Sequence, residues 1–413
     1  MPQLLRIEEP QRAPRPLPPR ADKSDVYPLW RLGFRPFFLF GVVFSLFALA
    51  LWIGFYAGWT PAPATWEPLG GWLSWHRHEM PFGFATAIVA GFLLTAIQNW
   101  TSRPSLSGKP LLGLFALWAL ARLAWLVGAP WPVAAAPELA FLLLLAFATG
   151  RLLWRARQSH NYSAPFTIVM MAAADALSIA GLATVNDDWQ RNGALAVVWL
   201  IVALMTMIGG RVIPFFTQRG LGRAAPRPAP LWLDATLMAA ALVLALLSAF
   251  GLGATASLVW VAPFALLAVA HAWRLWRWHD RDIWRVPLLW SLHLACLWLA
   301  VALAAFALFH AGWLTSSSIA LHALTVGAMS GLILAMIARV SLGHTGRPLQ
   351  ASGAMTWAFA LLNLGAAARV FVAPYFFMAG LAVATVCWLA AFGIFAWRYA
   401  PILLAPRADG KPG

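Results

Sequence analysis

The sequence predicts an all-α protein, a polytopic transmembrane helix bundle of about twelve spans with the N-terminus and the C-terminus both cytoplasmic. Hydrophobic residues make up 62% of its 413 residues and charged residues only 10%. Soluble domains average about 45–50% apolar residues, glycine included, and about 25% charged residues. The apolar residues gather in runs of about twenty, the length at which a helix crosses a bilayer. The basic residues lie in short segments between these runs, as they do in membrane proteins.

Each predicted span is an apolar stretch long enough to cross the hydrocarbon core. The third and the eleventh are the shortest, and each contains one arginine, Arg122 or Arg369. Together the spans form a predicted membrane domain of residues 36–398. They cover Phe37–Gly58, Glu79–Ile97, Leu111–Gly128, Pro132–Arg151, Phe166–Thr184, Gly193–Phe216, Leu231–Gly251, Thr255–Trp276, Pro287–His310, Ser316–Leu342, Met355–Phe371 and Pro374–Trp397.

Both ends of the chain are polar. Residues 1–35 hold seven Lys and Arg residues and many prolines. This composition predicts a basic, Pro-rich cytoplasmic tail in an extended or disordered state. The tail has no apolar core of the signal-peptide kind. Residues 399–413 form a predicted short cytoplasmic tail of similar character.

The distribution of basic residues predicts the orientation, because loops rich in Lys and Arg stay in the cytoplasm. A net charge of +15 would point to nucleic acid in a soluble protein. Here the charges mark topology, so we expect a lipid bilayer and no nucleic acid as partner. The opposite loops are nearly free of basic residues and carry Glu67, Asp187, Asp188 and Arg191, with Arg77 at one helix mouth. The predicted cytoplasmic segments carry Arg103, Lys109, Arg151, Arg155, Arg157, Arg219, Arg223, Arg227, Arg274, Arg277, Arg281, Arg285 and Arg347.

One weak internal echo is present. Gly108-Lys-Pro-Leu follows the second predicted span, and Gly346-Arg-Pro-Leu follows the tenth. An arginine-containing span comes after each. Internal repeats are common in membrane transporters, so the echo raises the hypothesis of a structural duplication. The two cysteines, Cys296 and Cys387, lie in separate apolar runs and offer neither a disulfide framework nor a CxxC metal pair.

Five histidines in or beside the spans are the candidate ligands. Imidazole is the commonest metal ligand and a usual axial ligand of haem. For each histidine a satisfied interhelical ring is the alternative. These residues are His76 and His78 in Trp-His-Arg-His-Glu-Met, His293, His322 and His344.

Helix geometry limits how these histidines combine. His322 and His344 are separated by roughly 33 Å along one helix, so they cannot share a metal. We therefore predict an outer centre and an inner centre, the inner one with His293 and His344. The outer centre draws on His76, His78, His322 and Met80, whose thioether favours copper.

A regular helix separates His76 from His78 by about 200°. The two rings can converge only if the start of the second span is not helical. Pro81 indicates such an irregular start, because proline sits best in a first helical turn.

Arginines and carboxylates inside the spans form a second class of candidates. Arg211 and Arg339 lie near the inner ends of their spans, where they could bind anionic groups such as haem propionates. Snorkelling to lipid headgroups is the alternative, especially for Arg339. Arg122 and Arg369 lie in the outer halves of their spans. Glu79 and Asp175 are their candidate acidic partners.

Several segments resemble the NnrS family over about residues 30–397. They include Leu32-Gly-Phe-Arg-Pro-Phe-Phe-Leu, Trp75-His-Arg-His-Glu-Met-Pro-Phe-Gly-Phe, Ala90-Gly-Phe-Leu-Leu-Thr-Ala, Gly209-Gly-Arg-Val-Ile-Pro-Phe-Phe-Thr, His322-Ala-Leu-Thr-Val-Gly-Ala and Leu342-Gly-His-Thr-Gly-Arg-Pro-Leu. The resemblance implies a bacterial inner-membrane protein of twelve helices with bound haem and copper. It also implies a role in the response to nitric oxide and nitrosative stress, linked to denitrification. The residues that match the family pattern are His76, His78, Arg211, His293, His322 and His344.

Two other functions stay open at this point. A secondary transporter of a metal or small solute also has about twelve spans, but carboxylates at the bilayer midplane are scarce here, with Asp175 the main exception. A quinol-linked oxidoreductase of the haem-copper type would gather its histidines in one region, and these are dispersed. The sequence assigns no reaction and no electron donor.

Overall fold

The structure is a computed structural model that describes residues 26–58, 66–223 and 230–411. Most of the predicted tail of residues 1–35 lies outside the described residues. Its last part is helical, since a short 3-10 helix (η1, Pro28–Trp30) precedes the first span, which begins at Phe34. Within the described chain there are helices but no strand.

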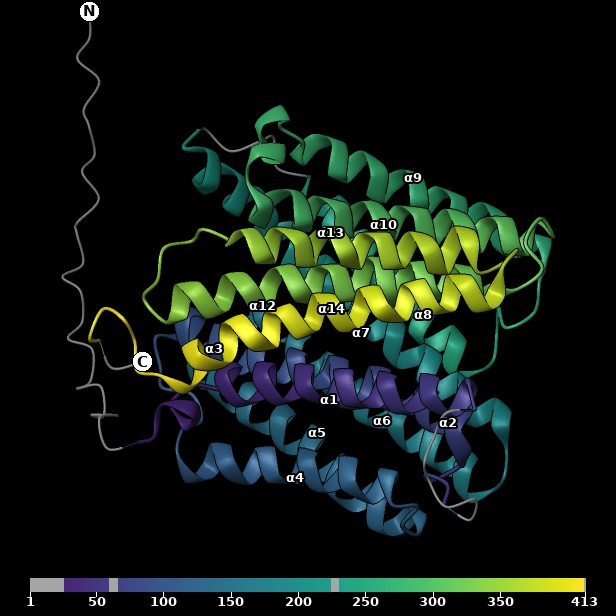
Figure 1. Cartoon of the computed structure of the whole chain (residues 1–413), viewed down its shortest axis with the longest axis horizontal. Coiled ribbons are helices and arrows are strands. Elements are labelled where there is room, and N and C mark those ends of the chain that lie inside the picture. The colour runs from purple at the N-terminus through teal and green to yellow at the C-terminus, as the bar shows by residue number, and fades with distance from the viewer. Residues whose placement is uncertain (1–25, 59–65, 224–229, 412–413) are drawn as a thin grey trace, which may run out of the picture.

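The twelve predicted spans are confirmed, because twelve helical segments of the described chain are long and apolar enough to cross a membrane. They lie side by side in one bundle, with α4 and α9 at opposite edges of the view in Figure 1. The spans are α1 (Phe34–Tyr56), α2–η2–α3 (Gly71–His78, Glu79–Ala85, Thr86–Thr101), α4 (Lys109–Leu126), α5 (Trp131–Arg155), α6 (Ser163–Ala183), α7 (Asp187–Leu221), α8 (Leu231–Ala249), α9 (Val261–Trp278), α10 (Pro287–His310), α11–η6–α12 (Ser317–His322, Ala323–Met329, Ser330–His344), α13–η7 (Gly353–Ala367, Ala368–Val372) and α14 (Phe377–Leu404).

The first and last spans meet at one end of the bundle. Arg35, in the first turn of α1, is fully buried and donates from Nη1 to the carbonyl oxygens of Leu403 and Ala405, at 2.8 and 2.7 Å. A guanidinium thus satisfies carbonyls that the end of α14 leaves without a helical partner. This end lies on the left in Figure 1 and is here called the basic end. Because successive spans run in opposite directions, it also holds the loops and helix ends with Arg103, Lys109, Arg155, Arg157, Arg281, Arg285 and Arg347. An even number of crossings follows, while the cytoplasmic side remains a prediction from charge.

The second span corrects one sequence-based boundary. It is helical from Gly71, whereas the prediction began it at Glu79. The irregular start that Pro81 indicated is absent, and Pro81 instead lies within the π-helical segment η2. The boundary was predicted too late because the polar residues of Trp-His-Arg-His-Glu lower the local hydropathy. Several of these residues are nevertheless inside the bundle, where side chains from other spans pair with them. The last helix likewise continues through Pro401 to Leu404, past the predicted limit at Trp397.

A π-helical segment interrupts both the second and the tenth span, directly after a histidine. η2 follows His78 and η6 follows His322. In both segments the fifth residue after the histidine is a glycine, Gly83 or Gly327, and a neighbouring side chain packs too closely for a Cβ atom. Single-turn π segments gather at functional sites. The shared pattern supports the duplication hypothesis. It also makes the second and tenth spans candidates for the location of a functional site.

Close packing of α6 against α7 depends on Gly193. A Cβ atom there would lie 2.4 Å from the carbonyl oxygen of Ala174 and 2.7 Å from the amide nitrogen of Ser178. We expect Gly193→Leu to destabilise the protein by about 1–3 kcal/mol or more, since overpacking forces backbone shifts. Thermal unfolding in detergent measures this effect. Gly393→Leu is the control, because a Cβ atom on Gly393 meets nothing within 4 Å. Equal melting temperatures for both variants would refute the packing argument.

Candidate functional site

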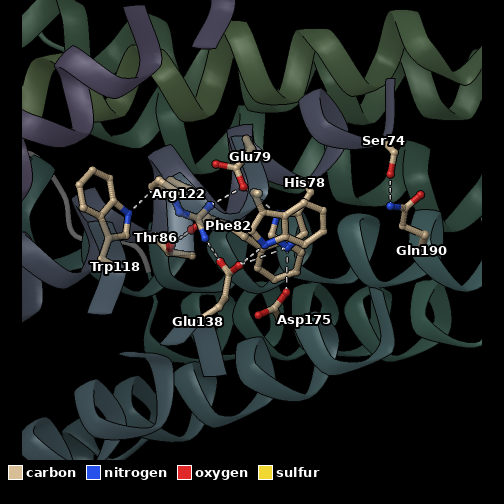
Figure 2. A network of polar contacts seen from close by, with 12 residues as sticks. Ser74, His78, Glu79, Phe82, Thr86, Trp118, Arg122, Glu138, Asp175 and Gln190 are labelled. Atoms are coloured by element: carbon tan, nitrogen blue, oxygen red, sulfur yellow. Dashed lines mark hydrogen bonds and ion pairs between the residues drawn. The ribbon is translucent and has the colours of Figure 1, made fainter. Parts of the chain in front are cut away.

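Five ionisable side chains from four spans meet inside the bundle and are called the charged cluster. His78 ends α2, Glu79 begins η2, Arg122 lies on α4, Glu138 on α5 and Asp175 on α6. Arg122 is 5% exposed, Glu138 is 2% exposed, and the other three are fully buried. Figure 2 shows them converging on one another, with Arg122 between the two glutamates and Asp175 beside His78.

The imidazole of His78 lies at the centre of the charged cluster. Its Nδ1 is 3.1 Å from Glu79 Oε1, and its Nε2 is 3.0 Å from Asp175 Oδ1. Glu138 Oε2 is 3.7 Å from the same Nε2. The ring stacks on Trp125, with 3.7 Å between ring centroids. Carboxylates on both sides and aromatic faces hold the ring in one orientation.

Arg122 joins two of the carboxylates. Its Nη1 donates to Glu79 Oε1 at 2.7 Å, and its Nη2 donates to Glu138 Oε1. The indole of Trp125 donates to the other oxygen of Glu138 at 2.7 Å. Trp118 donates at 2.9 Å to the carbonyl oxygen of Gly83 in η2. α4 therefore supplies donors both to the carboxylates and to the backbone of the π-helical segment.

The charges of this cluster do not balance. Three carboxylates face one guanidinium, which leaves a net charge of −2 with neutral His78 and −1 with protonated His78. Glu79 Oε2 and Asp175 Oδ2 are buried and have no hydrogen-bond partner among the described residues. Donor atoms of His78, Glu138 and Asp175 all lie within 4.8 Å of one another, as ligands of one metal ion do. The arrangement therefore attracts a cation.

The charged cluster lies within the depth of the membrane. Glu138 is the eighth residue of α5, and Asp175 precedes the end of α6 by eight residues. At 1.5 Å per residue, each lies roughly 10–12 Å inside its helix. An ionisable group at such depth is costly in a bilayer and marks function by default.

A second group, the histidine–arginine cluster, consists of His76, His322, Arg369 and Ser318. Arg369 Nη2 donates to Ser318 Oγ at 3.0 Å, and that oxygen is 3.2 Å from His322 Nδ1. His76 interacts electrostatically with both Arg369 and His322. Its ring stacks on Trp52 of α1, with centroids 4.2 Å apart. Here the local charge is positive, opposite in sign to that of the charged cluster.

The hydrogen bonds of His322 prepare its ring for ligation. Its Nδ1 is 2.7 Å from the carbonyl oxygen of Ser318, an acceptor, so Nδ1 carries the proton. Nε2 of the neutral ring then keeps its lone pair. Metal-ligating histidines commonly donate their other ring nitrogen to a carbonyl in this way.

The structure divides the predicted outer centre into two parts. It places His76 in electrostatic range of His322, but it places His78 in the charged cluster, because the regular helix turns the rings of His76 and His78 to different sides. Met80 is partly buried and packs against an apolar cluster to which several helices contribute, α1, α12 and α14 among them. Of the predicted charged residues, Arg122, Glu79 and Asp175 belong to the charged cluster, and Arg369 belongs to the histidine–arginine cluster.

The predicted inner histidines have separate surroundings. His293 is buried, with Nδ1 2.9 Å from the carbonyl oxygen of Leu289 and Nε2 3.4 Å from that of Trp278. The ring of His344 lies 5.7 Å from that of Phe34. In the described parts of the chain, no hydrogen bond, ion pair or ring contact joins the two histidines.

Arg407 fastens the C-terminal segment beside His344. Its Nη1 donates to the His344 carbonyl oxygen at 2.9 Å. The same guanidinium hydrogen-bonds Asp409 and holds the pKa of that carboxyl below its ordinary value.

The two inner arginines have protein partners. Arg211 Nη1 donates to Asn161 Oδ1 at 2.5 Å, and Nη2 donates to the carbonyl oxygen of His160 at 3.2 Å. Arg339 is buried, with its guanidinium carbon 3.8 Å from the ring centroid of Phe216. Arg211 thus fastens a loop, and Arg339 makes a cation–π contact.

Sequence reasoning missed three buried charges. Arg35, which the prediction placed in the cytoplasmic tail, is fully buried in the first turn of α1. Glu138 lies within the fourth predicted span, so the rule that intramembrane carboxylates are functional candidates could have found it. Arg274, which the prediction counted among the cytoplasmic charges, is 2% exposed and pairs with Asp234 at 3.1 Å. Its position near a span end hid that role.

Comparison with known proteins gives one family. The profile of the NnrS family, described as NnrS protein, matches residues 28–407, nearly the whole chain. No curated protein matches. The chain therefore belongs to the NnrS family.

Proposed function

We propose that this protein is a haem- and copper-binding protein of the bacterial inner membrane that acts in the response to nitric oxide and nitrosative stress, linked to denitrification. Family membership and the twelve spans support this proposal. The observation that carries it is the excess of negative charge around the buried imidazole of His78 in the charged cluster. Such a cluster is suited to a metal cation, and ionisable side chains within a membrane are functional candidates by default.

Copper fits the charged cluster. His78, Glu138 and Asp175 would hold it, through donor atoms that already lie within 4.8 Å of one another. The partnerless Asp175 Oδ2 offers a further oxygen. A divalent ion would bring the net charge of the cluster with neutral His78 from −2 to zero. The thioether of Met80 is not part of this set.

Haem fits the histidine–arginine cluster. His322, whose Nε2 keeps its lone pair, and His76 would supply nitrogen ligands, and Arg369 would bind a propionate. Among the described residues, the guanidinium of Arg369 hydrogen-bonds Ser318 and pairs with no carboxylate. His293 and His344 are the candidate ligands of an inner haem, whereas Arg211 and Arg339 already have other contacts.

When bound, haem iron and copper supply centres that bind nitric oxide or exchange an electron with it. Nitric oxide is small and uncharged, so it needs no charged pathway through the bundle. The chain itself would contribute the buried side chains of His78, Glu138 and Asp175, from which water is excluded, and imidazole rings held in fixed orientations by hydrogen bonds and ring stacking.

Spectroscopy and metal analysis of the purified protein test the proposal. After expression with haem and copper supplied, we expect a Soret band and about one copper ion per chain. A preparation that is folded but has neither a Soret band nor copper would contradict the proposal.

The charged cluster also favours a second candidate, a cation-coupled secondary transporter. Transporters of this class use carboxylates inside the membrane. Glu138 is a second buried carboxylate of this kind beside Asp175, and the sequence analysis did not identify it. Solute uptake into vesicles that is lost in Asp175→Asn would support transport. Uptake by the wild type equal to that of empty vesicles would exclude it for the solute tested.

A further inference from the structure

Two adjoining cavities open on the outer surface of the bundle near its basic end. The first, of about 500 Å³, lies between α4 and α5 and is lined by Gly113, Leu117, Leu144 and Ala148 among others. The second, of about 490 Å³, lies between α5 and the start of α6. Ligand sites commonly have about 300–1,000 Å³. Leu144 and Phe147, which line the first cavity, are exposed, so the cavity opens to the surroundings of the protein.

The two cavities share two lining residues of α5, Phe147 and Arg151, which lie between them. The side chain of Phe147 is 62% exposed, and that of Arg151 is also exposed. Most of the lining is apolar. A cationic group between two mainly apolar cavities suits a phospholipid, with the headgroup at Arg151 and one acyl chain in each cavity.

The charge at the mouth of the cavities is positive. Arg151 lines both cavities, Arg155 lines the second, and Arg103 Nη2 donates to the carbonyl oxygen of Arg155 at 3.4 Å. No hydrogen bond or ion pair to protein occupies the guanidinium groups of Arg151 and Arg155 in the part of the chain that the structure describes. No carboxylate is among the described lining residues.

Two further groups suit a lipid headgroup. Ser105, which lines the first cavity, has a buried hydroxyl without a hydrogen-bond partner among the described residues. Trp154 and Tyr162 line the second cavity and stack with 5.9 Å between ring centroids. Trp and Tyr gather at the headgroup level of bilayers.

We infer that these cavities form a binding site for one anionic phospholipid, held by Arg151 and Arg155 at the headgroup and by the α4–α5 and α5–α6 hollows at the acyl chains. Basic pockets between spans bind such headgroups. The site is separate from both clusters and does not depend on the proposed haem and copper.

Native mass spectrometry of the full chain in detergent tests the inference, with phosphatidylglycerol as anionic probe and phosphatidylcholine as zwitterionic probe. We expect phosphatidylglycerol to bind more tightly. Arg151→Gln and Arg155→Gln should each weaken it about fivefold, since one arginine near a membrane surface contributes about 1 kcal/mol. Gly113→Phe should fill the first cavity, because a Cβ atom there meets nothing within 4 Å.

Matched controls distinguish lipid binding at these cavities from non-specific attraction of an anionic lipid to a basic protein. Arg281→Gln and Arg285→Gln, as single variants, each remove the same charge elsewhere at the basic end, and Gly393→Phe adds the same bulk on α14. These controls should keep the affinity of the wild type. Equal binding of both lipids, or equal losses in controls and test variants, would overturn the inference. A dimer in the wild type that Gly113→Phe abolishes would also overturn it, by showing that a second copy fills the cavity.

Discussion

Replacing Arg122 by glutamine is expected to destabilise the folded protein by about 3–5 kcal/mol, because removing one partner of a buried ion pair leaves the other charge uncompensated. Arg122 contacts both Glu79 and Glu138, and all three side chains are buried. Its loss leaves three carboxylates with only His78 as a cationic partner in the cluster. Thermal unfolding of the purified protein and its yield after size-exclusion chromatography measure the effect.

A control and a rescue make this prediction specific. Arg191→Gln breaks the exposed pair with Asp188 and should change stability by less than about 1 kcal/mol. Adding Glu79→Gln to Arg122→Gln removes one carboxylate with the guanidinium, so the double variant should recover part of the lost stability. An Arg122→Gln protein as stable as the wild type, or a double variant less stable than either single variant, would contradict the charge count.

The second large effect concerns metal affinity. Asp175→Asn should weaken copper binding at least 10–100-fold, the loss typical of removing even an outer partner of a metal site. The variant should stay folded, because it removes one of the excess negative charges and asparagine can still accept a hydrogen bond from His78. Copper titration of the metal-free protein measures the affinity.

Asp187→Asn is the matched control, since Asp187 is exposed and pairs with Arg77 at the helix mouth. It should bind copper as the wild type does. Unchanged affinity in Asp175→Asn would remove the charged cluster from the list of copper sites.

The fold was predictable because the bilayer constrains both the length of a span and the side on which basic loops lie. A span needs about 20 apolar residues, and basic loops alternate along the chain with loops that hold few basic residues, so length and charge sufficed for twelve helices. The start of the second span was not predictable in this way. His78 and Glu79 read as polar residues at a helix mouth, yet they are buried because Arg122, Glu138 and Asp175 compensate them from three other spans. A hydropathy scale scores each residue separately and therefore does not include ion pairs between different spans.

The site was predictable only in part. Helix periodicity correctly warned that a regular helix separates His76 from His78, but it could not say which partners each ring would meet. Arg369 was recognised as an intramembrane charge, while its position beside His76 and His322 depends on how the eleventh span packs. Packing partners in a helix bundle are long-range contacts, which one sequence does not specify.

The most direct test of the central claim, that charge divides the two cofactors between two clusters, is a paired analysis of haem and copper in Asp175→Asn and His322→Ala. Absorption spectra and elemental analysis of both purified proteins provide the numbers. We predict that Asp175→Asn loses copper and keeps the Soret band, and that His322→Ala loses or shifts the Soret band and keeps copper. Parallel loss of both cofactors in folded samples of each variant, or retention of both, would contradict the account.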